Sequence, residues 1–135
     1  MYTDAGLFVL SLIADERAPY VSASKSFVES VVRGERAVST SVLTWDEVVY
    51  VVRRLLGPED SQEKAEDLLA LPNLNWVSAD LAVIREASNL YRTLPLRPRD
   101  AIHAASAIRA GEHEIVSEDR AFDRVPGLRR IWPPP

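Results

Sequence analysis

The sequence contains no cysteine among its 135 residues. Disulfide scaffolds, thiolate metal sites and thiol catalysis are therefore excluded, and a reducing compartment is compatible with the chain. Long apolar runs are also lacking: near the N-terminus the longest, residues 7–10, is interrupted by Ser11 and falls far short of the roughly 18 residues that a membrane span requires. The first residues include Asp4 and no basic residue, which argues against a signal peptide. We therefore expect a soluble, cytoplasmic protein with no membrane partner.

An excess of positive charge is missing as well. The chain has 16 Lys and Arg against 20 Asp and Glu, a formal net charge of -4. This total does not suggest a strongly basic nucleic-acid binder. The total would mislead if several acids gathered at one metal site, because removing four carboxylates leaves 16 acids against 16 bases. The charge count thus leaves a metal-dependent function on nucleic acid open.

The pattern along the chain alternates short apolar stretches, typical of strands, with stretches of helical periodicity. The expected strands cover residues 1–3, 37–40, 74–77, 114–117 and 128–132. The expected helices cover residues 7–13, 19–33, 41–56, 59–71, 80–94 and 99–110. Strands separated by helices imply crossover connections, and hence a mostly parallel sheet with helices on both faces. With no repeat or long linker, we predict one α/β domain over residues 1–135.

Four acidic residues follow predicted strands or lie near the start of the helices that leave them: Asp4, Glu47, Asp100 and Asp119. Ligands of open parallel sheets gather beyond the carboxyl ends of the strands. We therefore expect these four acids, which come from separate segments, to lie at the same edge of the sheet.

Carboxylates in such a cluster raise one another's pKa above the ordinary value of about 4. A divalent cation removes this repulsion, and hard oxygen ligands suit Mg²⁺ or Mn²⁺. A cation held in this way can activate a water and stabilise the leaving oxygen of an in-line displacement. The chemistry that follows most directly is hydrolysis of a phosphodiester bond.

These residues resemble the PIN-domain ribonucleases, and within them the VapC toxins of toxin–antitoxin pairs. Four elements, in order along nearly the whole chain, carry the resemblance: a first strand ending in Asp (Tyr2-Thr3-Asp4), Glu47 six residues after Ser41, Asp100 opening the Ala-rich stretch 99–107, and a Ser-x-Asp-x-x-Phe element from Ser117 through Asp119 to Phe122. Each element is weak alone, and the four together in this spacing are fairly specific.

The resemblance implies a three-layer α/β/α fold with a short, mostly parallel central sheet surrounded by helices. It also implies Mg²⁺- or Mn²⁺-dependent endonuclease action on RNA, a cognate antitoxin protein and a homodimer. In this family the four acids, here Asp4, Glu47, Asp100 and Asp119, are the catalytic and metal-binding residues.

One departure from the family pattern concerns position 6. The family commonly has Asn or Ser two residues after the first Asp, and this chain has Gly6. Losing a group that supports a metal ligand often costs 10–100-fold in metal affinity or activity. An alternative function is therefore a catalytically weakened PIN domain that binds RNA or an antitoxin. A metal phosphatase is a third, weaker hypothesis, because Asp4-Ala5-Gly6 lacks the second acid of an Asp-x-Asp nucleophile motif.

Two of the four acids have acidic neighbours that compete with them. Asp46 adjoins Glu47, but the two point about 100° apart on a helix, and Asp46 fits a first-turn acid that complements the helix dipole. Glu118 and Asp123 flank Asp119. We favour Asp119 as the inward acid and keep Asp123 as a possible extra ligand.

Other polar residues are expected in supporting positions. Ser117 and Thr40 are predicted to hydrogen-bond backbone or carboxylate groups rather than to act as nucleophiles, because no histidine base adjoins either of them. His103, one helical turn after the third acid, is predicted to be a packed or supporting histidine rather than a ligand. Arg97 and Arg99, at the expected mouth of the site, are candidates for contacts with RNA phosphate or with surface acids.

Overall fold

A computed structural model describes the whole chain except residues 13, 14 and 16. Its strands are β1 (Tyr2–Thr3), β2 (Val38–Ser41), β3 (Leu74–Val77), β4 (Glu114–Val116) and β5 (Arg129–Ile131). Its α-helices are α1 (Ala5–Leu12), α2 (Val21–Val32), α3 (Leu43–Leu56), α4 (Pro58–Leu69), α5 (Leu81–Thr93) and α6 (Pro98–Arg109), and a 3-10 helix, η1, covers Arg120–Arg124. No helix in the described part of the chain is long and apolar enough to cross a membrane.

All five strands pair in parallel, in the order β3-β2-β1-β4-β5. The chain moves outward from β1 through β2 to β3, then returns to the other side of β1 to form β4. Strand β1 is therefore the point where the strand order reverses, and Tyr2 pairs with Ser39 on one side and Ile115 on the other. Ligand sites of parallel sheets form at such switch points.

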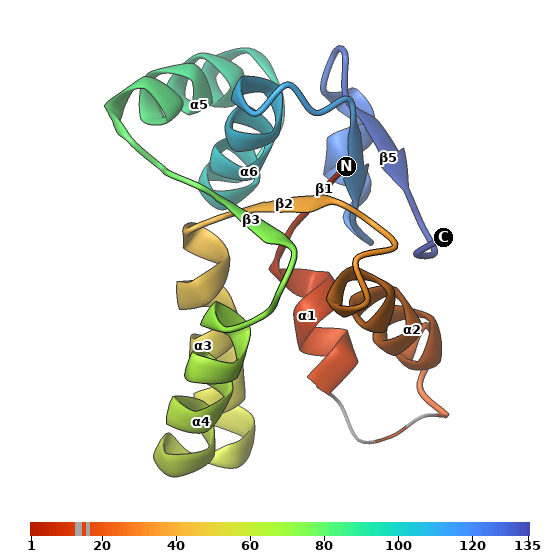
Figure 1. Cartoon of the computed structure of the whole chain (residues 1–135). Coiled ribbons are helices and arrows are strands. Elements are labelled where there is room, and N and C mark those ends of the chain that lie inside the picture. Colours follow the sequence, from red (N-terminus) through yellow and green to blue (C-terminus); the bar gives the residue numbers. More distant parts are fainter. Residues whose placement is uncertain (13–14, 16) are drawn as a thin grey trace.

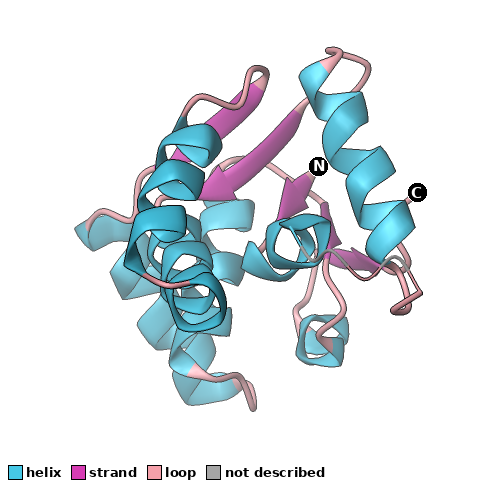
Figure 2. Ribbon diagram, turned by 90° about the horizontal axis from the view of Figure 1, so that it is seen from below, coloured by secondary structure: helices cyan, strands magenta, loops and turns pink. Residues whose placement is uncertain are grey.

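The sheet separates two apolar cores, because alternate residues of a strand point to opposite faces. Ile115 packs in the core formed with α5, α6 and η1, and its neighbour Val116 packs in the core formed with α1 to α4. Figure 1 shows α5 and α6 above the sheet and α1 to α4 below it. Figure 2, from below, shows helices in front of the strands. The predicted three-layer α/β/α fold is confirmed.

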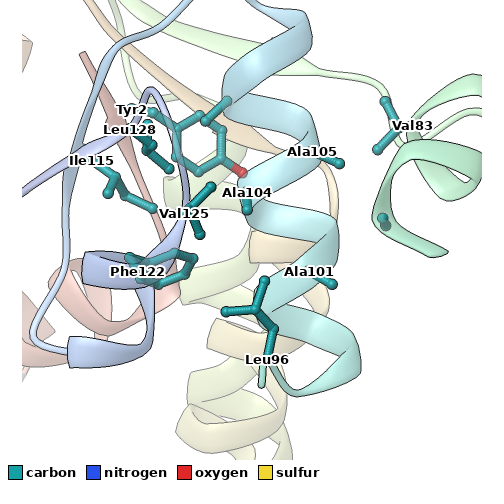
Figure 3. Packing of buried hydrophobic residues seen from close by; sticks show 12 residues of the cluster. Tyr2, Val83, Leu96, Ala101, Ala104, Ala105, Ile115, Phe122, Val125 and Leu128 are labelled. Atoms are coloured by element: carbon teal, nitrogen blue, oxygen red, sulfur yellow. The ribbon is translucent and has the colours of Figure 1, made fainter. Parts of the chain in front are cut away.

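Helix α6 packs between α5 and the rest of the core, and small alanine side chains lie on both of these sides. Ala101, Ala104 and Ala105 are at most 1% exposed. Figure 3 shows Ala104 toward Val125 and the buried Phe122 of η1, and Ala101 and Ala105 on the side of α5. The first turn of α6 lines the same cleft as the residue that follows β1.

Most predicted boundaries agree with the structure to within about two residues. Asp80 caps α5 by accepting a hydrogen bond from Val83 N–H over 2.9 Å, as expected of a capping residue. Helix α1 begins two residues before the predicted start, and the predicted end at residue 13 lies outside the described residues. Helix α2 begins at Val21 rather than at Pro19, because Tyr20 adopts a left-handed conformation with φ of 66°. The 3-10 helix η1 was not predicted.

Candidate active site

An open cleft of about 250 Å³ lies where β1 and β4 end. Its lining residues are Asp4, Ala5, Gly6, Glu47, Arg97, Asp100, His103, Glu118 and Asp119. The structure thus brings all four predicted acids into one cleft and adds a fifth, Glu118. The acids come from four segments: the residue after β1, helix α3, the first turn of α6 and the segment after β4. The result is a concentrated negative charge opposed in the lining by one arginine.

Asp4 is a partly buried acid of the cleft and is held by two donors. Its Oδ1 accepts a hydrogen bond from Gly6 N–H over 3.1 Å, and its Oδ2 accepts one from the Ser117 hydroxyl. Burial raises the pKa of Asp4, and the negative charge of Glu47 adds to this effect, while the hydrogen bond from Ser117 opposes it. The ionised form of Asp4 is therefore costly unless a positive charge offsets it.

Glu47 enters the cleft from α3 and contacts His103 of α6. His103 Nε2 lies 2.7 Å from Glu47 Oε2, and the two side chains are 3% and 16% exposed. Asp46, the rival acid, is 60% exposed and lies outside the cleft, 3.8 Å from Arg99. Of the two neighbouring acids, the structure therefore places Glu47 in the site.

Arg97 bridges the remaining two predicted acids. Its Nε donates to Asp100 Oδ2 over 2.9 Å, its backbone N–H donates to the same oxygen over 3.3 Å, and its guanidinium also pairs with Asp119 Oδ2. Asp119 Oδ1 accepts a hydrogen bond from Ala121 N–H over 2.8 Å, which caps η1. The Arg97 side chain is 75% exposed, so solvent screens this pairing and a competing cation can displace it.

The space above Gly6 is bordered by two carboxylates. A Cβ built on Gly6 would lie 3.3 Å from Asp4 Oδ1 and 3.9 Å from Glu118 Oε1. Glu118 therefore reaches toward the volume that a side chain at position 6 would take. Sequence reasoning treated Glu118 only as a rival of Asp119; the structure lines the cleft with both.

The sequence predicts supporting positions for Ser117 and Thr40 and an extra ligand at Asp123. The structure places these three side chains in different surroundings. Ser117 hydrogen-bonds Asp4, whereas the buried Thr40 hydroxyl bonds the carbonyl of Thr3 and the Thr44 hydroxyl. Thr40 thus bonds the backbone, one of the two kinds of partner predicted for it, and within the described part of the chain it makes no hydrogen bond with the acids of the cleft.

Asp123 also lies away from the four predicted acids. Its carboxylate pairs with Arg130 over 2.9 Å, and it does not line the cleft. The pairing with Arg130 lowers the pKa of Asp123. A fifth ligand at Asp123 is therefore not supported by this geometry. Arg99 stays at the mouth, with Nε 4.0 Å from Glu47 Oε1.

The donor groups of the cleft fit a hydrated divalent cation. Among the described residues, no three Asp, Glu, His or Cys side chains are grouped closely enough to hold an ion by themselves. Mg²⁺ typically binds one or two carboxylates and keeps several waters, so it does not require such a group. The cleft supplies hard oxygen donors and negative charge in an open volume that admits waters.

These features define an α/β domain with an acidic cleft at the switch point of a parallel sheet. Residues 1–128 match the PIN domain family, and the chain belongs to this family. The resemblance to PIN domains inferred from the four acidic elements is thereby confirmed. A search of the curated proteins gives no match.

Several solved structures have a similar fold. A toxin–antitoxin complex from Klebsiella pneumoniae is 20% identical, with a TM-score of 0.67 over 94% of this chain and 93% of that one. VapBC2 from Rickettsia felis, bound to a DNA fragment from its promoter, is 16% identical, with a TM-score of 0.71 over 96% of both chains. VapC20 from Mycobacterium tuberculosis, a toxin that cleaves the sarcin–ricin loop, is 12% identical, with a TM-score of 0.67 over 84% of this chain and 85% of that one. At these identities the likeness shows a shared fold.

The raised pKa of Asp4 predicts how stability depends on pH. Between the ordinary Asp pKa of about 3.9 and its raised value, the folded state binds more protons than the unfolded state, so stability falls as pH rises through this window. Asp4→Asn lacks this titration. We expect the free energy of unfolding of Asp4→Asn, relative to wild type, to be more favourable at pH of about 7 than at about 4, measured by urea denaturation in EDTA.

Asp123→Asn is the matched control with the opposite sign. Because Arg130 lowers the pKa of Asp123, that carboxylate contributes stability above the ordinary Asp pKa and loses it as pH falls. The free energy of unfolding of Asp123→Asn, relative to wild type, should therefore be less favourable at neutral pH than in acid. If the difference in the free energy of unfolding between Asp4→Asn and wild type were the same at both pH values, the prediction would be contradicted.

Proposed function

We propose that this protein is a metal-dependent endoribonuclease that hydrolyses RNA phosphodiester bonds with Mg²⁺ or Mn²⁺, and that it acts in the cytoplasm as the toxin of a toxin–antitoxin pair. The observation that carries the proposal is the meeting of five carboxylates from four segments in one cleft of a PIN domain. Such a charge cluster is costly unless a cation offsets it. The VapC20 structure, whose toxin cleaves an RNA loop, supports RNA as the substrate class.

In this proposal Asp4, Glu47, Asp100 and Asp119 hold the cation. When bound, the cation supplies charge for the phosphate and lowers the pKa of a water nucleophile. The protein itself orients the oxygen donors: Gly6 N–H and the Ser117 hydroxyl fix Asp4. Because the Ser117 hydroxyl is committed to Asp4, we propose direct attack by water without a covalent intermediate.

Asp100→Asn tests the catalytic assignment. The Asn side-chain oxygen can still accept the Arg97 N–H at the start of α6, so the fold should be retained. Loss of the carboxylate should lower cleavage by at least about 100-fold, since even the outer partners of metal ligands are worth 10–100-fold. The measurement is cleavage of labelled single-stranded and structured RNAs in Mg²⁺, Mn²⁺ or EDTA, with circular dichroism as the test of folding.

Asp46→Asn is the matched control, because it removes a neighbouring acid that lies outside the cleft. It should cleave as wild type does. Full activity of Asp100→Asn would overturn the assignment. Cation binding by wild type without any cleavage would instead support the alternative, a PIN domain that binds RNA or an antitoxin without turnover.

Arg97 and Arg99 are proposed as the contacts for RNA phosphate. Arg97 pairs with Asp100 and Asp119, so a bound cation would compete with it and free the guanidinium for phosphate. Arg97→Ala should leave cation affinity unchanged or up to about fivefold tighter, because an exposed ion pair contributes only about 0–1 kcal/mol. Arg97→Ala should also weaken RNA binding and reduce the magnitude of the slope of log affinity against log salt concentration by about one.

Calorimetry with Mn²⁺ measures the cation affinity. RNA titrations at several salt concentrations, in the cleavage-deficient Asp100→Asn background, measure RNA binding and its salt dependence. Arg109→Ala, at the opposite end of α6, is the matched control. An unchanged salt dependence in the Arg97 variant would remove Arg97 from the RNA interface.

The proposed protein partner is an antitoxin. Structures of similar fold from Klebsiella pneumoniae and Rickettsia felis contain a toxin with its antitoxin, which supports a partner of this kind. This chain also has an apolar hollow of about 130 Å³ formed by α1, α2 and α4. Its lining residues are Phe8, Ser11, Leu12, Val28, Lys64, Asp67, Leu68 and Leu71. Such a hollow suits apolar side chains of a partner helix.

We also propose a homodimer formed through helix α5. Three of its large apolar side chains, Leu81, Ile84 and Tyr91, are 65%, 40% and 54% exposed. Light scattering should give about twice the chain mass of 15.1 kDa. Ile84→Glu should give the single-chain mass, because it places an unpaired charge in the contact. Leu55→Glu, on α3, is the control that should remain dimeric, and a dimer of Ile84→Glu would exclude this surface.

A further inference from the structure

A buried chain of hydrogen bonds joins the sheet to Glu47, and the mechanism above leaves it without a role. The backbone N–H of Ser41 donates to the Tyr2 hydroxyl over 3.0 Å, and this hydroxyl lies 2.8 Å from His103 Nδ1. His103 Nε2 lies 2.7 Å from Glu47 Oε2. Tyr2 is fully buried and His103 is 2% exposed, so little water competes for these contacts. Figure 3 shows the Tyr2 hydroxyl oxygen against helix α6.

The Ser41 amide sets the direction of this chain. An amide N–H only donates, so the Tyr2 hydroxyl accepts from it and has its own hydrogen left for His103 Nδ1. Burial raises the pKa of Tyr2, which keeps that hydrogen on the phenol. The Ser106 hydroxyl lies close enough to Tyr2 to influence its pKa, but it makes no well-formed hydrogen bond within the described part of the chain, whereas His103 Nδ1 lies 2.8 Å from the Tyr2 oxygen. His103 is therefore the acceptor for this hydrogen. A neutral imidazole that accepts at Nδ1 carries its hydrogen on Nε2 and donates it to Glu47.

The two carboxylate oxygens of Glu47 therefore have different surroundings. Oε2 is engaged by His103, whereas the nearest cationic group to Oε1, Arg99 Nε, is 4.0 Å away. We propose that Tyr2 and His103 are positioning residues that hold Glu47 by Oε2 and leave Oε1 as the oxygen for the divalent cation. This inference rests on the proposed metal-dependent function. Hydrogen-bonded partners of this kind orient metal ligands and typically contribute 10–100-fold in metal affinity.

The imidazole tautomer is the readout that does not depend on metal or activity. The chain has two histidines, so a His113→Gln variant assigns the ¹⁵N signals of His103 directly. In metal-free protein we expect the Nε2–H tautomer for His103. Tyr2→Phe should convert this signal to a mixture of tautomers, and Ser24→Ala, which removes a buried hydroxyl on α2, should leave it unchanged. An Nδ1–H tautomer or a doubly protonated ring in the wild type would overturn the inference.

Metal affinity tests the consequence for Glu47. Calorimetry with Mn²⁺ should show binding weakened by about 10–100-fold in His103→Ala. His103→Gln should recover part of this loss, because its side-chain amide can donate to Glu47 from a similar position. Ser24→Ala, which removes a buried hydroxyl on α2, should bind as wild type does. Equal Mn²⁺ affinity in His103→Ala and wild type would overturn the positioning role.

A cleavage assay separates positioning from a direct part in the reaction. His103→Ala should regain cleavage as Mn²⁺ is raised, whereas Asp100→Asn should not. A His103→Ala variant that binds Mn²⁺ normally and stays inactive at every concentration would overturn the inference. Wild type that binds no Mn²⁺ would instead refute the proposed function, and the tautomer measurement distinguishes the two failures, because it reports the relay in metal-free protein.

Discussion

The repulsion among carboxylates gathered in one cleft is the constraint on which the rest of the site depends. Like charges at short range destabilise one another, and each of the four predicted acids is held by at least one donor. Asp4 is held by a backbone amide and a hydroxyl, and Glu47 by His103. Arg97 pairs with the other two, Asp100 and Asp119. The donors keep the acids in place without cancelling all of their charge, and in the function that we propose this remaining charge attracts the cation.

The fold brings these acids together through the position of its shortest strand. Strand β1 has only two residues, yet it lies at the centre of the sheet, so Asp4 emerges at the switch point between β2 and β4. The buried alanines of α6 pack this helix closely in the core, and its first turn carries Asp100 to the same cleft. On the far side, the buried ring of Phe122 anchors η1, whose N-terminal cap is Asp119. Packing and the acidic cleft are thus linked, because the elements that build the core also set the positions of the acids.

The sequence was sufficient to predict the strands and α-helices, though not η1, and to expect the four acids at one edge, because parallel strands end at one edge and the acids follow strand ends or open helices. Three features of the cleft and its surroundings could not be predicted. Glu118 and Asp119 are adjacent, and no periodicity shows that both side chains reach the cleft. Tyr2 lies in a predicted strand, where an aromatic residue is expected in the core, so nothing in the sequence indicates a role for its hydroxyl. Its contact with His103 joins residues 101 positions apart, which local pattern does not reveal. Each of the three depends on side-chain packing between elements.

The glycine at position 6 bears on whether the site is catalytic or only binds. Without a side chain, position 6 lacks the amide or hydroxyl common in the family, but Gly6 N–H still donates to Asp4 Oδ1. A Cβ there would lie 3.3 Å from that same oxygen, closer than an ordinary van der Waals contact. The space left free adjoins the carboxylate of Glu118. The cleft therefore lacks the neutral polar group common at position 6, and Glu118 lies beside the space that remains. Because every carboxylate added to a cleft raises the electrostatic demand for a cation, Glu118 supports the metal-dependent function that we propose over the alternative of a PIN domain that only binds.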